Sequence, residues 1–209
     1  MRLQKYINNN LNESYMVKDW LEVVDKLKQD CKPFIREKKK GKWLYRGIKK
    51  SMPPVDIVKP RKNRKPRDMP EDLHDELDYK FKEEFGWKSR SEGVFCTSNM
   101  TDAGYYGEPF IIYPIGKFKY VWSKQISDLY MYLKRNGIIQ EVLYQTPTSN
   151  KLEQIAKDIV DLYQEHNLDD AMDEESEVSI LCDSYYALDM WFLEPLDADK
   201  DYSNTILSI

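Results

Sequence analysis

Apolar residues recur at three- and four-residue intervals in several parts of this chain, a spacing that places them on one face of a helix. The first such stretch covers residues 14–31, where the recurring positions are Val17, Trp20, Leu21, Val24 and Leu27. The same spacing predicts further helices over residues 70–85, 127–134 and 150–166. Pro70 favours the start of the second helix and Gly86 its end.

Other stretches are short, β-branched and aromatic, with glycine and proline at their ends, which is typical of strands. The predicted strands and further apolar stretches cover residues 42–48, 93–98, 109–115, 118–122, 177–182 and 184–193. Helices come first and strands dominate the middle and the end, so the order favours an α+β fold over alternating βαβ units.

The first predicted strand, KWLYRGI (42–48), contains one unexpected residue. Alternation places Leu44, Arg46 and Ile48 on one face, so that an arginine lies between two apolar side chains. A guanidinium keeps its charge in proteins, and burying it without a partner is costly. Arg46 therefore requires a partner that this strand does not supply.

The net charge of −4 over 209 residues conceals two halves of opposite sign. Residues 1–100 hold 24 basic and 16 acidic side chains, whereas residues 101–209 hold 8 and 20. Six bases lie in KPRKNRKPR (59–67) and six acids in DDAMDEESE (169–177). Both stretches can be solvated loops, or the first can be a basic rim that attracts an anionic ligand or target. The proline-rich basic segment 51–69 predicts a long mobile loop.

The composition of the chain indicates the cellular compartment of the protein and which kinds of site it can hold. The chain is 41% hydrophobic and contains no apolar run of about 18 residues, so we expect no membrane span. The N-terminal residues lack the apolar centre of a secretory signal. Three cysteines and two histidines without ligand spacing predict a cytoplasmic protein with neither a disulfide framework nor a metal site. Cys96 is expected to be a small buried residue rather than a nucleophile.

Three separated features suggest a single site. They are Arg46 in the YRG strand, Cys96-Thr97-Ser98 at the end of a later strand, and Glu175-Ser176-Glu177 at the entrance to another. Each is weak alone, but in this order they resemble the arginine-serine-glutamate class of ADP-ribosyltransferases. The resemblance covers about residues 44–188, and it departs from the family where Cys96 replaces the first serine.

The resemblance implies a split, two-sheet ADP-ribosyltransferase-like core with flanking helices. Residues 1–40 would form an N-terminal helical element and residues 41–209 the transferase-like domain, with 51–69 as its mobile basic loop. NAD⁺ would be the co-substrate, without a metal. Arg46, Gly47, Thr97 and Ser98 would bind it, the guanidinium of Arg46 holding the diphosphate and Gly47 allowing close approach of the ligand.

The family pattern also implies three catalytic residues. Glu177 would stabilise the positive charge that develops on the ribose when the nicotinamide leaves. Ser98 would hydrogen-bond Glu177 and fix its rotamer, and Glu175 would orient or deprotonate the acceptor. Side chains at i and i+2 of an extended chain point the same way, so both glutamates can face one cleft. Four aromatic residues could stack on the ligand or belong to the core: Tyr105, Tyr106, Phe110 and Tyr113.

The stretches KPRDMPEDLH and GWKSRSEGVFCTS also resemble small proteins of tailed bacteriophages. Together the resemblances imply a cytoplasmic effector that modifies a host macromolecule, with a protein arginine favoured over a nucleic acid. Two other hypotheses stay open. The chain could be a non-catalytic inhibitory or structural protein on a degenerate transferase fold, or a nucleic-acid-binding module that uses residues 59–67.

Overall fold

The structure, a computed structural model, describes residues 13–49, 52–145 and 147–189. Its helices are α2 (Glu13–Asp30), α3 (Lys32–Glu37), α4 (Glu71–Phe85), α5 (Ser89–Glu92), α6 (Met100–Gly104), α7 (Leu129–Arg135), α8 (Ile138–Gln145), α9 (Ser149–Val160) and α10 (Leu168–Asp173). Its strands are β1 (Tyr45–Ile48), β2 (Val55–Val58), β3 (Val94–Cys96), β4 (Glu108–Pro114), β5 (Lys119–Trp122), β6 (Val178–Leu181) and β7 (Tyr185–Asp189).

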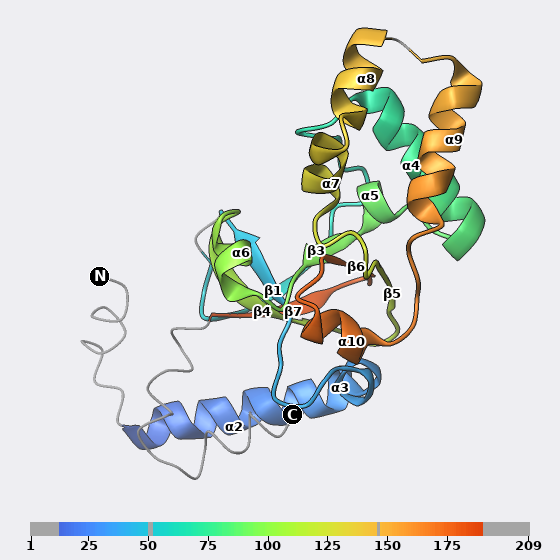
Figure 1. Cartoon of the computed structure of the whole chain (residues 1–209). Helices are drawn as coiled ribbons and strands as arrows, with labels where there is room; N and C mark the ends of the chain where they lie inside the picture. The colour runs from blue at the N-terminus through green and yellow to red at the C-terminus, as the bar shows by residue number, and fades with distance from the viewer. Residues whose placement is uncertain (1–12, 50–51, 146, 190–209) are drawn as a thin grey trace.

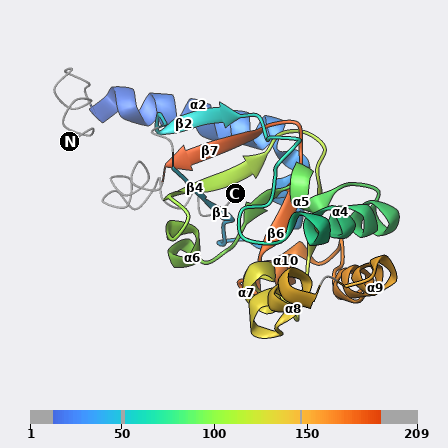
Figure 2. The ribbon, with the colours of Figure 1, turned by 90° about the horizontal axis from the view of Figure 1, so that it is seen from above.

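The strands form two antiparallel sheets. The first has the order β1-β4-β7-β2, and the second has the order β3-β6-β5. Figure 2 shows the four strands of the first sheet side by side, with α2 packed beneath them. The predicted α+β class and its two sheets are confirmed. The part of the predicted 184–193 stretch beyond residue 189 lies outside the described residues.

In the described part of the chain, one pair of backbone hydrogen bonds joins β1 of the first sheet to the residue that follows β3 of the second. Tyr45 N donates to Thr97 O at 2.7 Å, and Thr97 N donates to Tyr45 O at 3.0 Å. Beyond this bridge β1 continues into the first sheet, where it pairs with β4, while β3 pairs with β6 of the second. Strands β1 and β3 therefore diverge from a single fixed point, which leaves space between them.

The segment predicted as a loop, residues 51–69, contains a strand, so that prediction was wrong in part. Val55–Val58 pairs with Tyr185–Leu188 of β7 and forms the edge of the first sheet. The local reason is the sequence Val-Asp-Ile-Val, whose β-branched residues favour an extended chain. An edge position also tolerates the neighbouring prolines, because it needs ladder hydrogen bonds on one side only.

The first of two apolar cores lies between the sheets, α10 and the N-terminal helices α2 and α3 (Figure 1). The predicted spacing holds in α2, where Val24 and Leu27 are almost completely buried. The side chains of Val17, Trp20 and Leu21 lie outside the described ones. Helix α3 adds Phe34, whose ring meets that of Tyr113 edge-on with centres 5.7 Å apart.

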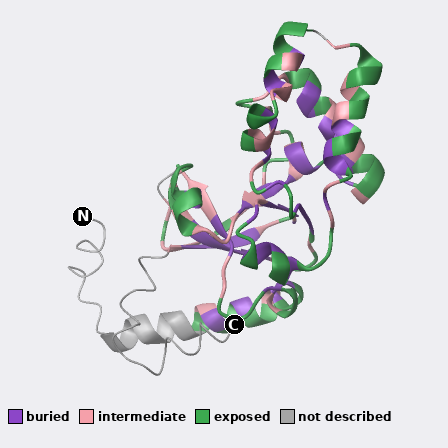
Figure 3. Cartoon of the chain, in the orientation of Figure 1, coloured by how far each residue is buried: buried purple, intermediate pink, exposed green. Residues whose placement is uncertain are grey.

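The second core holds the helices α4, α7, α8 and α9 together at one end of the molecule (Figure 1). Leu73, Leu77 and Phe81 of α4 are completely buried, as their four-residue spacing predicts. Gly86 ends α4 in the left-handed conformation with φ of 81°. Figure 3 shows the outer faces of these helices exposed, whereas β4 and β7, the inner strands of the first sheet, are largely buried. Among the described helices, none has both the length and the apolar character to cross a membrane.

Candidate functional site

A cleft of about 690 Å³ lies where β1 and β3 diverge. Five of the six predicted site residues line it: Arg46, Gly47, Thr97, Glu175 and Glu177. They come from three separate parts of the chain, in the order that the resemblance requires. The sixth, Ser98, is outside the lining.

Arg46 lies half-buried on β1, and its side chain forms one hydrogen bond with the described residues. Its Nη1 donates to the carbonyl oxygen of Phe95 at 3.2 Å. No carboxylate of the described residues forms an ion pair with Arg46. Because a guanidinium carries five N–H donors, Arg46 keeps most of its hydrogen-bonding capacity for whatever enters the cleft.

Two further arginines, which the sequence analysis did not identify as site residues, lie on the ring of Phe95. The guanidinium carbon of Arg64 is 4.4 Å from the ring centre, and that of Arg90 is 4.1 Å from it. Arg64 also donates to the carbonyl oxygen of Gly93. Burial, together with the charges of Arg46 and Arg90, lowers the pKa of Arg64 to about 10. Three guanidiniums thus converge on one side of the cleft.

Glu177 pairs with Arg90 and not with Ser98, so the predicted positioning role of Ser98 was wrong. Arg90 Nη1 donates to Glu177 Oε1 at 2.8 Å, and the two side chains are only 10% and 20% exposed. Ser98 donates its hydroxyl proton to the carbonyl oxygen of Met172, at 2.5 Å. The chain turns after the Tyr45–Thr97 bridge, and this turn points Ser98 at α10 instead of at the cleft.

A buried carboxylate holds the helix that carries Arg90. Asp78, 4% exposed on α4, accepts hydrogen bonds from the backbone N–H of Arg90 at 2.7 Å and of Ser91 at 3.2 Å. It also accepts a hydrogen bond from the hydroxyl of Ser91. These bonds satisfy N–H groups in the first turn of α5, which has no side-chain cap of its own. Arg90 is therefore held at its backbone by Asp78 and at its guanidinium by Glu177.

Glu175 lies at the exposed edge of the cleft, in the left-handed conformation with φ of 54°. The chain between Glu175 and Glu177 is thus not extended, although both residues line the same cleft. Thr97 donates its hydroxyl proton to the backbone carbonyl of Glu175 at 3.1 Å, so its observed role is to hold this loop. Asn99 Nδ2 donates to Glu175 Oε2 at 2.8 Å.

Asn99 has a second contact that the sequence could have predicted. Its Oδ1 accepts hydrogen bonds from the backbone N–H of Thr101 and Asp102 and so caps α6. An asparagine just before a short polar stretch is a standard helix start, although the spacing of apolar residues predicts no helix here. The side chain therefore joins α6 to the loop that carries Glu175.

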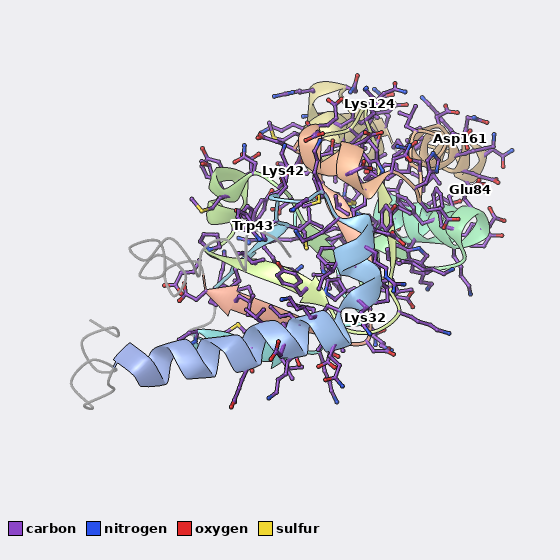
Figure 4. The ribbon with its side chains drawn as sticks, turned by 90° about the horizontal axis from the view of Figure 1, so that it is seen from below. Lys32, Lys42, Trp43, Glu84, Lys124 and Asp161 are labelled. Atoms are coloured by element: carbon purple, nitrogen blue, oxygen red, sulfur yellow. The ribbon has the colours of Figure 1, made fainter. Side chains whose placement is uncertain are left out.

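Lysines neutralise part of the acidic segment 169–177. Lys42 and Lys124, which are labelled in Figure 4, pair with Asp173 at 2.9 Å and with Glu174 at 3.1 Å. Lys39 also pairs with Asp173. Glu175 forms no ion pair with any described residue, so its charge stays available at the edge of the cleft.

A close approach of two backbones is sufficient to require a glycine at position 47, and the approach of a ligand to Gly47 stays a prediction. A Cβ at Gly47 would lie 2.2 Å from the carbonyl oxygen of Ala103 and 2.7 Å from the nitrogen of Gly107.

We expect Gly47→Ala to lower the free energy of unfolding by about 2 kcal/mol, because the turn after α6 must shift. Chemical denaturation measures this value. Gly104→Ala is the control, since its Cβ would meet no atom within 4 Å; an equal loss in both variants would contradict the explanation.

The four candidate aromatic residues divide into two pairs. Phe110 and Tyr113 are 1% exposed and belong to the core. Tyr105 and Tyr106 line the cleft and are 80% and 54% exposed, and the hydroxyl of Tyr106 donates to Asp128 at 3.3 Å. Only the second pair can stack on a ligand.

By the resemblance, Cys96 stands where the ADP-ribosyltransferases have their first serine. It is 4% exposed, so the prediction that it is buried is confirmed, and burial raises the pKa of its thiol to about 12, which disfavours the nucleophilic thiolate. Within the described part of the chain, no three histidine, cysteine, aspartate or glutamate side chains gather in a way that could hold a metal ion.

No protein-family model, curated protein or solved structure matches this chain.

Proposed function

We propose that this protein is a mono-ADP-ribosyltransferase that cleaves NAD⁺ and transfers ADP-ribose to a host macromolecule. The observation that carries the proposal is the meeting of Arg46, Glu175 and Glu177 in one cleft, although up to 131 positions separate them in the sequence. A cluster of guanidiniums, one of which holds the carboxylate of Glu177, suits an anionic ligand whose sugar becomes cationic in the reaction.

In the proposed reaction, the bond between C1′ of the ribose and the nicotinamide nitrogen breaks, and its electron pair leaves with neutral nicotinamide. Positive charge develops on the ribose, and the carboxylate of Glu177 stabilises it. Arg90 holds Oε1 of Glu177, which leaves Oε2 for a ribose hydroxyl. The acceptor then attacks C1′ and loses a proton to Glu175 or to solvent.

The core would be the split, two-sheet transferase core that the resemblance implies, with α2 and α3 as the N-terminal helical element. For the acceptor we favour an arginine side chain of a host protein, because Glu175 is exposed at the edge of the cleft and lacks an ion-pair partner among the described residues. A carboxylate in this position can bind and orient a guanidinium. A phage-encoded effector would act in the host cytoplasm.

The proposal is tested by incubating the purified protein with NAD⁺ that carries a label on its adenylate part. We expect free nicotinamide to accumulate, and the label to become attached to a component of a bacterial lysate when one is added. Release of nicotinamide is followed by chromatography, and the labelled component is found by gel electrophoresis. The absence of both nicotinamide release and labelling would reject the proposal.

Glu175 and Glu177 are expected to have separable roles. Glu175→Gln should reduce transfer to the acceptor by about 100-fold, within the usual range for a general base, and leave most of the slow NAD⁺ hydrolysis intact. Glutamine keeps the oxygen that accepts the hydrogen bond from Asn99, so the loop should stay in place. Both reactions are measured on the same preparation. An equal loss of hydrolysis and transfer would contradict a role confined to the acceptor.

A further inference from the structure

The basic segment 59–67 is not a uniformly exposed stretch of charge. Arg64, its central arginine, turns into the cleft and is anchored there by its backbone N–H, which donates to the carbonyl oxygen of Ser91 at 3.2 Å. Its guanidinium lies over Phe95 and bonds the carbonyl oxygen of Gly93. Of its basic neighbours, Lys62 is outside the lining and lies 3.6 Å from Asp183, whereas Lys65 also lines the cleft and pairs there with Glu71.

The charges around Phe95 do not balance. Arg46, Arg64 and Arg90 supply three positive charges at one side of the cleft, and Glu177, paired with Arg90, supplies one negative charge. The remaining charged residues of the lining are of both signs. No carboxylate of the described residues forms an ion pair with Arg46 or Arg64, so two guanidiniums lie unpaired next to Phe95, in a partly enclosed space where like charges repel more strongly than in water. Two negative charges are what the diphosphate of a dinucleotide carries.

We propose that Arg64 is a phosphate-binding residue of this cleft, and that Arg64 and Arg46 together hold the diphosphate of a nucleotide against Phe95. This inference rests on the proposed function only for the identity of the nucleotide, because the anion site is defined by the arginines themselves. It reassigns the basic segment: the central arginine binds the small ligand, and the segment is not a surface for docking an acidic target or a nucleic acid.

The geometry favours a diphosphate over a nucleic-acid strand. A strand would require a continuous exposed row of basic and aromatic side chains, whereas Lys62 and Lys65 pair with acidic residues of this chain. The planar guanidinium of Arg64 is held on two sides, by the ring of Phe95 and by the Gly93 carbonyl. A pre-positioned guanidinium binds phosphate oxygens with little loss of side-chain entropy.

The test measures binding of ADP and of inorganic pyrophosphate by calorimetry, so that it does not depend on catalysis. We expect Arg64→Gln to weaken the affinity for both by about tenfold or more. Arg61→Gln removes the same charge from an exposed position of the same segment, and we expect it to change either affinity by less than about twofold. Arg64→Lys keeps the charge but loses the planar group, and should bind less tightly than the wild-type protein. Thermal unfolding checks that each variant is folded.

Equal binding by Arg64→Gln and the wild-type protein would overturn the inference, and so would equal losses in Arg64→Gln and Arg61→Gln. Displacement of ADP by a short oligonucleotide, with both variants impaired, would assign the segment to a nucleic acid instead. The two proposals can fail separately. Tight binding of ADP through Arg64 without any consumption of NAD⁺ supports the anion site and rejects the transferase. Consumption of NAD⁺ by Arg64→Gln at the wild-type rate and affinity rejects the role of Arg64 and supports the transferase.

Discussion

Glu177→Gln is expected to reduce both NAD⁺ hydrolysis and transfer of ADP-ribose by at least about 100-fold, the usual effect of removing one group that stabilises charge in a transition state. Both reactions pass through the same cationic ribose, so both should fall together. Glutamine has the shape of glutamate and still offers an oxygen to Arg90. The loss would therefore come from the missing negative charge and not from a missing side chain.

The matched control is Glu174→Gln. Glu174 lies in the same acidic segment, and its side chain pairs with Lys124 at 3.1 Å while remaining 45% exposed. It should keep wild-type rates, because it does not line the cleft. Rates are measured at saturating NAD⁺, and NAD⁺ binding is measured separately, so that a loss of the chemical step is distinguished from a loss of affinity. A Glu177→Gln enzyme that keeps most of its activity would exclude Glu177 as the catalytic carboxylate.

Arg90→Met is expected to lower the free energy of unfolding by about 3 kcal/mol, the cost of removing one partner from a buried ion pair. The Arg90 side chain is 10% exposed and that of Glu177 is 20% exposed, so water would only partly solvate the remaining carboxylate. The contact of Arg90 with Phe95 would be lost as well. Methionine fills much of the same volume, which limits the contribution of a cavity. Denaturant titration followed by circular dichroism measures the change.

Two further variants test whether the loss of stability in Arg90→Met comes from the buried ion pair. In the double variant Arg90→Met, Glu177→Gln the unpaired charge is removed, so it should be more stable than Arg90→Met alone. Lys124→Met breaks the exposed pair with Glu174, whose side chains are 72% and 45% exposed, and should cost less than about 1 kcal/mol. If Arg90→Met costs no more than Lys124→Met, Arg90 does not hold Glu177 in the folded protein.

Local patterns in the sequence were sufficient for most of the elements that carry the site. The four-residue spacing of Leu73, Leu77 and Phe81 fixes which face of α4 is buried, because helical geometry alone determines it. Alternation places Arg46 on a strand between apolar neighbours. Glu175 and Glu177 line the same cleft, and residues only two positions apart in the sequence are always close in space. The α+β class follows from the same local patterns. The short helices α5, α6 and α10 were missed because one turn is too short to show a periodicity.

The partners of the site residues were decided by the tertiary structure. Whether Ser98 or Arg90 meets Glu177 depends on the direction of the chain after the Tyr45–Thr97 bridge, and no property of residues 96–98 alone specifies that direction. Arg64 is one of six bases in a segment whose composition predicts a solvated loop or a basic rim without distinguishing Arg64 from the other five. It enters the cleft because residues 91–95 offer it two carbonyl oxygens and an aromatic ring. The sequence by itself identified Arg46, Glu175 and Glu177 as candidate residues of one site, and all three line one cleft. Their surroundings depend on contacts between distant segments, and such contacts form only when the two sheets and the helices pack together.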